Sequence, residues 1–374
     1  MMTVNKRIGI ITSYFAANYG AMLQPFALKR VLEKMGCDVE VLRYRQQDIW
    51  DAYNPLSLRK LFQKSVTASL AAFLFLPWAL KKEYRFRCFM HRFINSDPGF
   101  DDNIKDDKDC YFIGSDQLWR TFGSDEHFDP VYMGYFETRA GARKISYAVS
   151  GEHLELNAEN KRYLQQAFRN FDMISVREQK RADDFSPLAE GKQIEVVLDP
   201  TLLATSDLYE ELPHENPMPE HPFIVFYCVR HSQHFVHKVY EYARRQNCHL
   251  LIFSEGFKPS LILMAMKHSD VHYYMTAGEE AFLGAMRYAK AVFTASFHGA
   301  AFAVINHRSL YSLMLDDGHD TRPKELLLAL GMGSRLLYLD KTIDESPIDY
   351  DKAENLLSAL RQKSMQFIDK ALND

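Results

Sequence analysis

The chain has 374 residues, a length that predicts two domains. Hydrophobic residues make up 47% of it and charged residues 25%, which excludes disordered, collagen-like and coiled-coil proteins. A formal net charge of −4 argues against a general nucleic-acid-binding protein. The five cysteines include no Cys-x-x-Cys pair, which argues against a disulfide framework and against a zinc site. We therefore expect a cytoplasmic protein with no metal site and no nucleic-acid partner.

The beginning of the chain predicts a parallel sheet. Residues 8–12 form a short β-branched run, apolar side chains recur at helical spacing over 21–35, and 39–42 form the next strand-like run. Gly36 stands where a glycine commonly ends a helix. A strand, a helix and a strand within about 35 residues make a βαβ unit, whose two strands run parallel.

Residues 46–105 interrupt this alternation with a basic and apolar insertion. The stretch 66–80 is apolar for fifteen residues, shorter than the roughly 20 that a membrane span needs, and Pro77 interrupts it. Between 46 and 92 the chain has eight Lys or Arg and three acidic residues. We favour a helix packed on its own domain. An interfacial segment that contacts anionic lipid and a membrane span are the alternatives.

Strand and helix patterns alternate again after the insertion. The sequence predicts strands at 110–113, 144–149, 173–176, 194–198, 223–229, 249–253, 291–294 and 310–313, and helices at 158–168, 233–245, 278–288, 299–305, 322–330 and 354–371. Four prolines between 213 and 222 predict a linker. We expect an α/β fold with Rossmann-like domains over 1–210 and 222–345, a cleft between them, and a C-terminal helix in 346–374 that packs back on the first domain.

The turns after the predicted strands hold the polar residues best suited to chemistry. Neither a Gly-x-Gly-x-x-Gly fingerprint nor a Walker A run occurs, so no dinucleotide or P-loop site is indicated. Asn18, Tyr19 and Gly20 precede a helix whose N-terminus suits an anion; alternatively, Asn18 only caps that helix. Asp116 follows a strand at the edge where open α/β sheets bind ligands; alternatively, it caps a turn.

His298 is the strongest single candidate. It stands at the carboxyl end of a strand and at the start of a helix of small residues, where it can exchange protons near neutral pH. Gly299 beside it allows the backbone to approach a ligand closely. Arg177 ends another strand and offers a planar fork to a carboxylate or phosphate; alternatively, it pairs with Glu178.

Five segments in order resemble the polysaccharide pyruvyl transferase family. They are ITSYFAANYGAMLQPFALKRVLEKMGCDVEVLRY, FIGSDQLW, ISVRE, VLDPTLL and GEEAFLGAMRYAKAVFTASFHGAAFAVIN. The resemblance implies that the two Rossmann-like domains have a glycosyltransferase-B-like arrangement. It also implies transfer of the pyruvyl group of phosphoenolpyruvate to a sugar of a polysaccharide precursor, which forms a cyclic ketal and releases phosphate.

The resemblance implies roles for particular residues, because phosphoenolpyruvate carries a carboxylate and a phosphate that cations and helix N-termini must hold. Catalysis is implied for His298 and Asp116. Donor binding is implied for Arg177, Ser296, Gly299 and Arg322. Acceptor or anion binding is implied for Asn18, Tyr19, Gly20, Gln24, Ser115 and Gln117.

Ser296 departs from some family members, which carry arginine there. One cation of the anion clamp is then missing, or is supplied by Arg322, Lys324 or Arg230. No cofactor is expected to be required, with phosphoenolpyruvate as co-substrate and a divalent ion as an optional aid. The acceptor is expected to be a sugar or a lipid-linked oligosaccharide, reached through peripheral contact of 59–92 with the inner membrane face.

Two other functions remain open from the sequence. The first is a nucleotide-sugar glycosyltransferase on the same architecture, which would need a ribose-binding carboxylate in the C-terminal domain. Glu279 and Glu280 could supply it, although they also fit as acidic residues at a helix start. The second is a catalytically idle sugar-binding protein.

Overall fold

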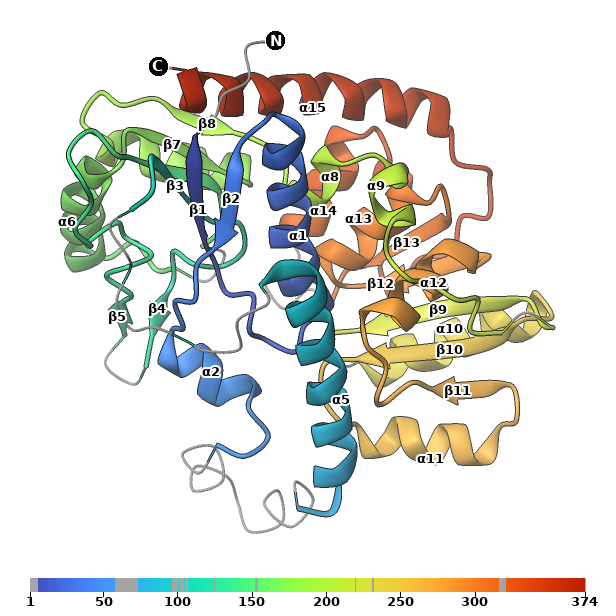
Figure 1. Ribbon diagram of the computed structural model, residues 1–374. Coiled ribbons are helices and arrows are strands. Elements are labelled where there is room, and N and C mark those ends of the chain that lie inside the picture. Colours follow the sequence, from blue (N-terminus) through green and yellow to red (C-terminus); the bar gives the residue numbers. More distant parts are fainter. Residues whose placement is uncertain are drawn as a thin grey trace.

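The computed structural model describes residues 6–57, 73–95, 100, 104, 107–123, 126–151, 154–218, 220–230, 232–315 and 321–373. Two parallel sheets, each with six strands, form the centres of two domains that lie side by side (Figure 1). A third sheet has two short strands. The expected fold class, two Rossmann-like domains in a glycosyltransferase-B-like arrangement with a cleft between them, is confirmed by these sheets and by the cavity described below.

The N-terminal sheet has the order β2-β1-β3-β6-β7-β8, with all neighbours parallel. Its strands are β1 (Arg7–Ile11), β2 (Asp38–Val41), β3 (Cys110–Ile113), β6 (Arg143–Val149), β7 (Met173–Val176) and β8 (Ile194–Val196), and the small separate sheet pairs β4 (Thr121–Phe122) with β5 (His127–Phe128). Every residue of β3 is buried, as expected for a central strand that helices cover on both faces.

The C-terminal sheet has the order β11-β10-β9-β12-β13-β14, again with all neighbours parallel. Its strands are β9 (Phe223–Cys228), β10 (His249–Ser254), β11 (Val271–Tyr273), β12 (Ala291–Thr294), β13 (Ser309–Leu313) and β14 (Leu336–Leu337). The continuously apolar β9 is buried throughout and sits in the middle of the sheet.

The helices begin and end at local signals. Asn18 caps the first helix by accepting a hydrogen bond from the Ala21 N–H at 3.1 Å. The α-helices are α1 (Tyr19–Lys34), α2 (Gln47–Tyr53), α5 (Leu76–Phe89), α6 (Ala158–Ala167), α7 (Gln179–Phe185), α8 (Pro200–Leu203), α9 (Ser206–Glu210), α10 (Gln233–Arg245), α11 (Pro259–Lys267), α12 (Glu279–Tyr288), α13 (Phe297–Ile305), α14 (Thr321–Ala329) and α15 (Tyr350–Asn373).

The long helix α15 crosses the top of both domains (Figure 1). Its C-terminal half contacts the N-terminal domain: the Leu198 N–H donates to Ser364 Oγ at 2.9 Å, and Arg143 donates to the Ala371 carbonyl at 2.7 Å. A helix contributed by the end of the chain therefore ties the second domain to the first.

The insertion after β2 contributes α2 and α5, and α5 runs on into a π-helical turn over Met90–Ile94. Residues 66–72 of the predicted apolar run lie outside the described residues. The buried face of α5 contacts both domains, because Phe89 packs on Phe26 of α1 while Lys82 donates to the Ser254 carbonyl at 2.8 Å. Within the described residues, none of the helices combines the length and apolar character that a membrane crossing requires.

Candidate active site between the two sheets

One cavity of about 260 Å³ lies where the strand order of both sheets changes direction. In the first sheet this point is between β1 and β3, and in the second it is between β9 and β12. Open α/β sheets bind ligands at the carboxyl ends of strands at such points. The segments that follow these four strands contribute Ser13, Asp116, Arg230 and Ser296 to the cavity wall. The cleft is therefore the position that the topology favours for a ligand.

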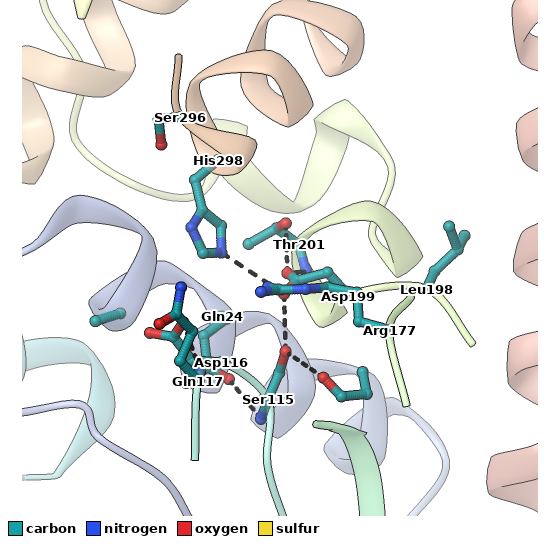
Figure 2. A network of polar contacts seen from close by, with 12 residues as sticks. Gln24, Ser115, Asp116, Gln117, Arg177, Leu198, Asp199, Thr201, Ser296 and His298 are labelled. Atoms are coloured by element: carbon teal, nitrogen blue, oxygen red, sulfur yellow. Dashed lines mark hydrogen bonds and ion pairs between the residues drawn. The ribbon is translucent and has the colours of Figure 1, made fainter. Parts of the chain in front are cut away.

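Asp199 organises the polar network beside this cleft (Figure 2). It caps α8 through its Oδ1, which accepts from the Thr201 N–H at 3.0 Å and from the Thr201 hydroxyl at 2.7 Å. Its Oδ2 accepts from Arg177 at 2.7 Å and from Ser115 Oγ at 2.8 Å, and lies 3.6 Å from His298 Nε2. We call these five residues the Asp199 cluster.

The Asp199 cluster keeps its carboxylate charged. Burial alone would raise the pKa of Asp199, but His298, Arg177 and the Thr201 hydroxyl outweigh burial and hold that pKa well below its ordinary value. The guanidinium of Arg177 also bonds Glu178 at 3.1 Å. One arginine thus faces two buried carboxylates.

His298 joins this buried charge to the cleft. It belongs to the first turn of α13, after Ser296, whose hydroxyl caps the helix, and its side chain also lines the cleft. Its ring packs against Gly20 of α1 so closely that a Cβ at position 20 would lie 1.9 Å from His298 Nδ1. Gly20 is therefore required for the imidazole to occupy this position, which explains a glycine in the first turn of a helix.

The site is built from both domains. Arg177, at the end of β7, has only 3% of its side chain exposed and lies under the ring of Phe297 from α13, 4.3 Å from the ring centroid. On the other side, Ser115 N–H donates to Gln24 Oε1 at 3.3 Å. In the amide orientation that satisfies both groups, the Gln117 oxygen accepts from the guanidinium of Arg322 at 2.7 and 3.1 Å. Residues of α1, β7 and α14 therefore support the cleft together.

A second charged group reaches the cleft through Asn18 and Glu255. Glu255 follows β10, lines the cleft, and accepts a hydrogen bond from the Asn18 amide of the other domain. Lys82 of α5 donates to the backbone beside it, and burial lowers the pKa of Lys82 to about 8. Burial also raises the pKa of Glu255 and, well above its ordinary value, the pKa of Glu279. We call Asn18, Lys82, Glu255 and Glu279 the Lys82 cluster.

A family model described as polysaccharide pyruvyl transferase matches residues 18–316. The matched region contains both clusters and every residue of the cleft wall except Ser13, Ala16 and Arg322. The chain belongs to this family. The resemblance stated from the sequence motifs is thereby confirmed, and with it the assignment to a family of transferases.

Similar solved structures include sugar-processing enzymes of low sequence identity. The glycotransferase of kitacinnamycin is 10% identical, with 99% of this chain and 100% of that chain covered and a TM-score of 0.46. The UDP-N-acetylglucosamine 2-epimerase from Neisseria meningitidis bound to UDP-N-acetylglucosamine is 12% identical, with 98% and 94% covered and a TM-score of 0.45. A search of curated proteins found no match.

The sequence-predicted site residues fall into three groups in this pyruvyl transferase family member. Those in the cleft wall are Asn18, Asp116, Gln117, Ser296, His298 and Arg322. Those that support the wall from behind are Gly20, Gln24, Ser115 and Arg177. Two pack elsewhere: Tyr19 stacks on Phe282 with its hydroxyl on the Ala277 carbonyl, and Gly299 packs on Thr294.

Several polar residues of the site are absent from the sequence-based prediction: Asp199, Thr201, Lys82, Glu255, Tyr53 and Arg120 are among them. Asp199 and Thr201 lie in the VLDPTLL segment, whose Asp-Pro pair already marks a helix start, so a local signal existed. The other four lie outside the recognised motifs. Of the cations considered as replacements at Ser296, Arg230 and Arg322 line the cleft, while Lys324 is exposed and does not.

Proposed function

We propose that this protein transfers the pyruvyl group of phosphoenolpyruvate to two hydroxyls of a sugar, which forms a ketal and releases phosphate. The observation that carries this proposal is the His298–Asp199 pair at the edge of a cleft that also holds three arginines, Arg120, Arg230 and Arg322. The phosphate and carboxylate of phosphoenolpyruvate need several cations, and its methylene carbon needs a proton donor. Membership of the pyruvyl transferase family supports the same reaction.

In this proposal His298 is the acid. It protonates the methylene carbon of phosphoenolpyruvate, and the electron pair of the C=C bond becomes the new C–H bond. The central carbon becomes electrophilic, a sugar hydroxyl adds to it, phosphate leaves with its bridging oxygen, and a second hydroxyl closes the ketal. The two hydroxyl protons balance the new methyl hydrogen and the phosphate proton. Asp199 stabilises the imidazolium before the transfer.

The two acidic residues of the cleft wall suit the acceptor. Asp116 and Glu255 are hydrogen-bond acceptors for sugar hydroxyls, and either can take the proton that the attacking hydroxyl releases. Glu255 fits this task because burial raises its pKa, with Asp116 nearby adding to the effect and Lys82 opposing it. Tyr53, which enters the cleft from the insertion, adds an aromatic ring to the same wall.

Calorimetric titration of phosphoenolpyruvate, with UDP and GDP as comparison ligands, tests this function. We expect saturable binding of phosphoenolpyruvate to the wild type, and binding about tenfold weaker for Arg322→Gln, because one guanidinium of the anion site is lost. The matched control is Lys324→Gln, which removes an exposed cation two residues away on the same helix and should leave binding unchanged. Saturable binding of UDP or GDP without phosphoenolpyruvate binding would contradict the proposal and favour a nucleotide-sugar glycosyltransferase.

A further inference from the structure

Exposed apolar side chains lie on two neighbouring helices, α11 of the C-terminal domain and α5 of the insertion. Helix α11 has six consecutive apolar residues over 261–266, yet only Leu261 is buried. Met266 is 77% exposed and Leu263 is also exposed. A short helix this apolar is normally covered by another part of its protein.

Helix α5 continues this surface from the other domain. The two helices meet where Phe75, just before α5, stacks on Phe257, just before α11, with ring centroids 5.4 Å apart. In Figure 1 the left end of α11 lies beside the lower part of α5. Trp78 of α5 is exposed, as is Leu74 before it. Because residues three and seven apart share one stripe of a helix, Lys81 and Arg85 lie on the same stripe as Trp78.

The charge beside these apolar residues is strongly positive. Residues 76–94 contain five Lys or Arg, of which all but the buried Lys82 are exposed or partly exposed, and one acidic residue; 258–267 contain two lysines and no acidic residue, in a chain of net charge −4. The one acidic residue, Glu83, pairs with Arg87 at 2.9 Å. Exposed aromatic and aliphatic side chains with adjacent Lys and Arg are the composition that binds the surface of an anionic bilayer.

We propose that α5 and α11 together form a surface that docks on anionic lipid, which we call the docking surface: Leu74, Trp78 and Lys81 with Leu263, Met266 and Lys267. A second copy of the chain fits less well, because a symmetric dimer through this face would bring like charges together. The sequence predicted membrane contact for the insertion alone. The structure adds α11 of the C-terminal domain. The segment before α11 also connects this surface to the cleft, because Glu255 lines the cleft and Phe257, two residues later in the chain, stacks on Phe75.

Co-sedimentation of the full chain with two kinds of vesicle tests this proposal. We expect the wild type to pellet with vesicles that contain roughly 30% anionic phosphatidylglycerol in phosphatidylcholine. It should pellet weakly with pure phosphatidylcholine, and binding should fall as salt is added. The double variant Leu263→Ser/Met266→Ser should lower the partition coefficient about tenfold, because two apolar side chains no longer enter the bilayer.

Two further variants separate lipid binding from misfolding. Leu339→Ser/Leu356→Ser replaces two exposed leucines outside the docking surface and should leave partitioning unchanged. Lys81→Glu/Lys267→Glu should abolish the preference for anionic vesicles. Failure of the wild type to pellet with anionic vesicles, or equal pelleting of wild type and Leu263→Ser/Met266→Ser, would overturn the proposal. A concentration-dependent dimer in sedimentation velocity that this variant loses would overturn it as well, in favour of a second copy.

Discussion

The Asp199 cluster and the Lys82 cluster differ in what happens to their buried charges: neighbouring groups keep the charge in the first, and burial favours the neutral forms in the second. In the Asp199 cluster one carboxylate has an arginine, a histidine and two hydroxyls around it, so its pKa is lowered and it stays ionised. In the Lys82 cluster burial dominates: the pKa of Lys82 falls to about 8, and the pKa values of Glu255 and Glu279 rise. The carboxylate of Asp199 therefore stays ionised, whereas Lys82 of the second cluster can change protonation close to neutral pH.

Removing the charge of Asp199 from the Asp199 cluster should have the largest effect on rate and stability. We expect Asp199→Asn to lower the turnover number about 1,000-fold, because the imidazolium of His298 loses its counter-charge. It should also lower the free energy of unfolding by about 3 kcal/mol, since Arg177 keeps only Glu178 as a buried partner. Steady-state kinetics and denaturant unfolding measure the two effects.

Ser115→Ala is the matched control for that change. It removes one hydrogen bond to the same Asp199 oxygen and leaves every charge in place. We expect it to cost about 1–2 kcal/mol of stability and less than about tenfold in rate. Equal losses of rate in both variants would mean that packing around Asp199, and not its charge, supports the reaction.

A substitution in the Lys82 cluster should change stability by a smaller amount that depends on pH. Both carboxylate oxygens of Glu279 are buried, and no other residue of the described part of the chain donates a hydrogen bond to them. Lys82, Glu280 and Tyr19 are the ionisable groups around it. A carboxyl whose pKa is raised in the folded state contributes stability below its unfolded pKa and loses it as the pH rises through the folded pKa. We expect Glu279→Gln, which stays neutral, to raise the free energy of unfolding by about 1 kcal/mol at pH 7 and by less at pH 4.

Denaturant midpoints of the wild type and Glu279→Gln at several pH values measure this effect. The exposed Glu280→Gln on the same helix is the control, and its midpoint should follow that of the wild type at each pH. A difference between wild type and Glu279→Gln that stays constant with pH, or that is larger at pH 4, would show that Glu279 is held ionised and that the two clusters do not differ as described.

The sequence could predict what depends on local pattern. Apolar periodicity indicated α1 and α10 within two residues, and polar residues after strands indicated Asp116 and His298, because carboxyl ends of parallel strands share one edge. It could not predict that Asp199 and His298, 99 residues apart, meet across two domains. The Lys82–Ser254 contact is likewise set by how an insertion packs on a distant strand, which no periodicity encodes. The apolar run 261–266 was visible, but its exposure is a tertiary property.

In the proposed reaction His298 delivers a proton to the methylene carbon of phosphoenolpyruvate. The most direct test is to incubate the protein with phosphoenolpyruvate and a panel of glycosides in D₂O, and to follow phosphate release together with the ketal methyl signal by NMR. We expect phosphate release that requires a glycoside, and a methyl group that carries one deuterium. His298→Gln should still bind phosphoenolpyruvate but lose at least about 100-fold in rate. Phosphate release at the same rate with His298→Gln as with the wild type would contradict the proposed role of His298.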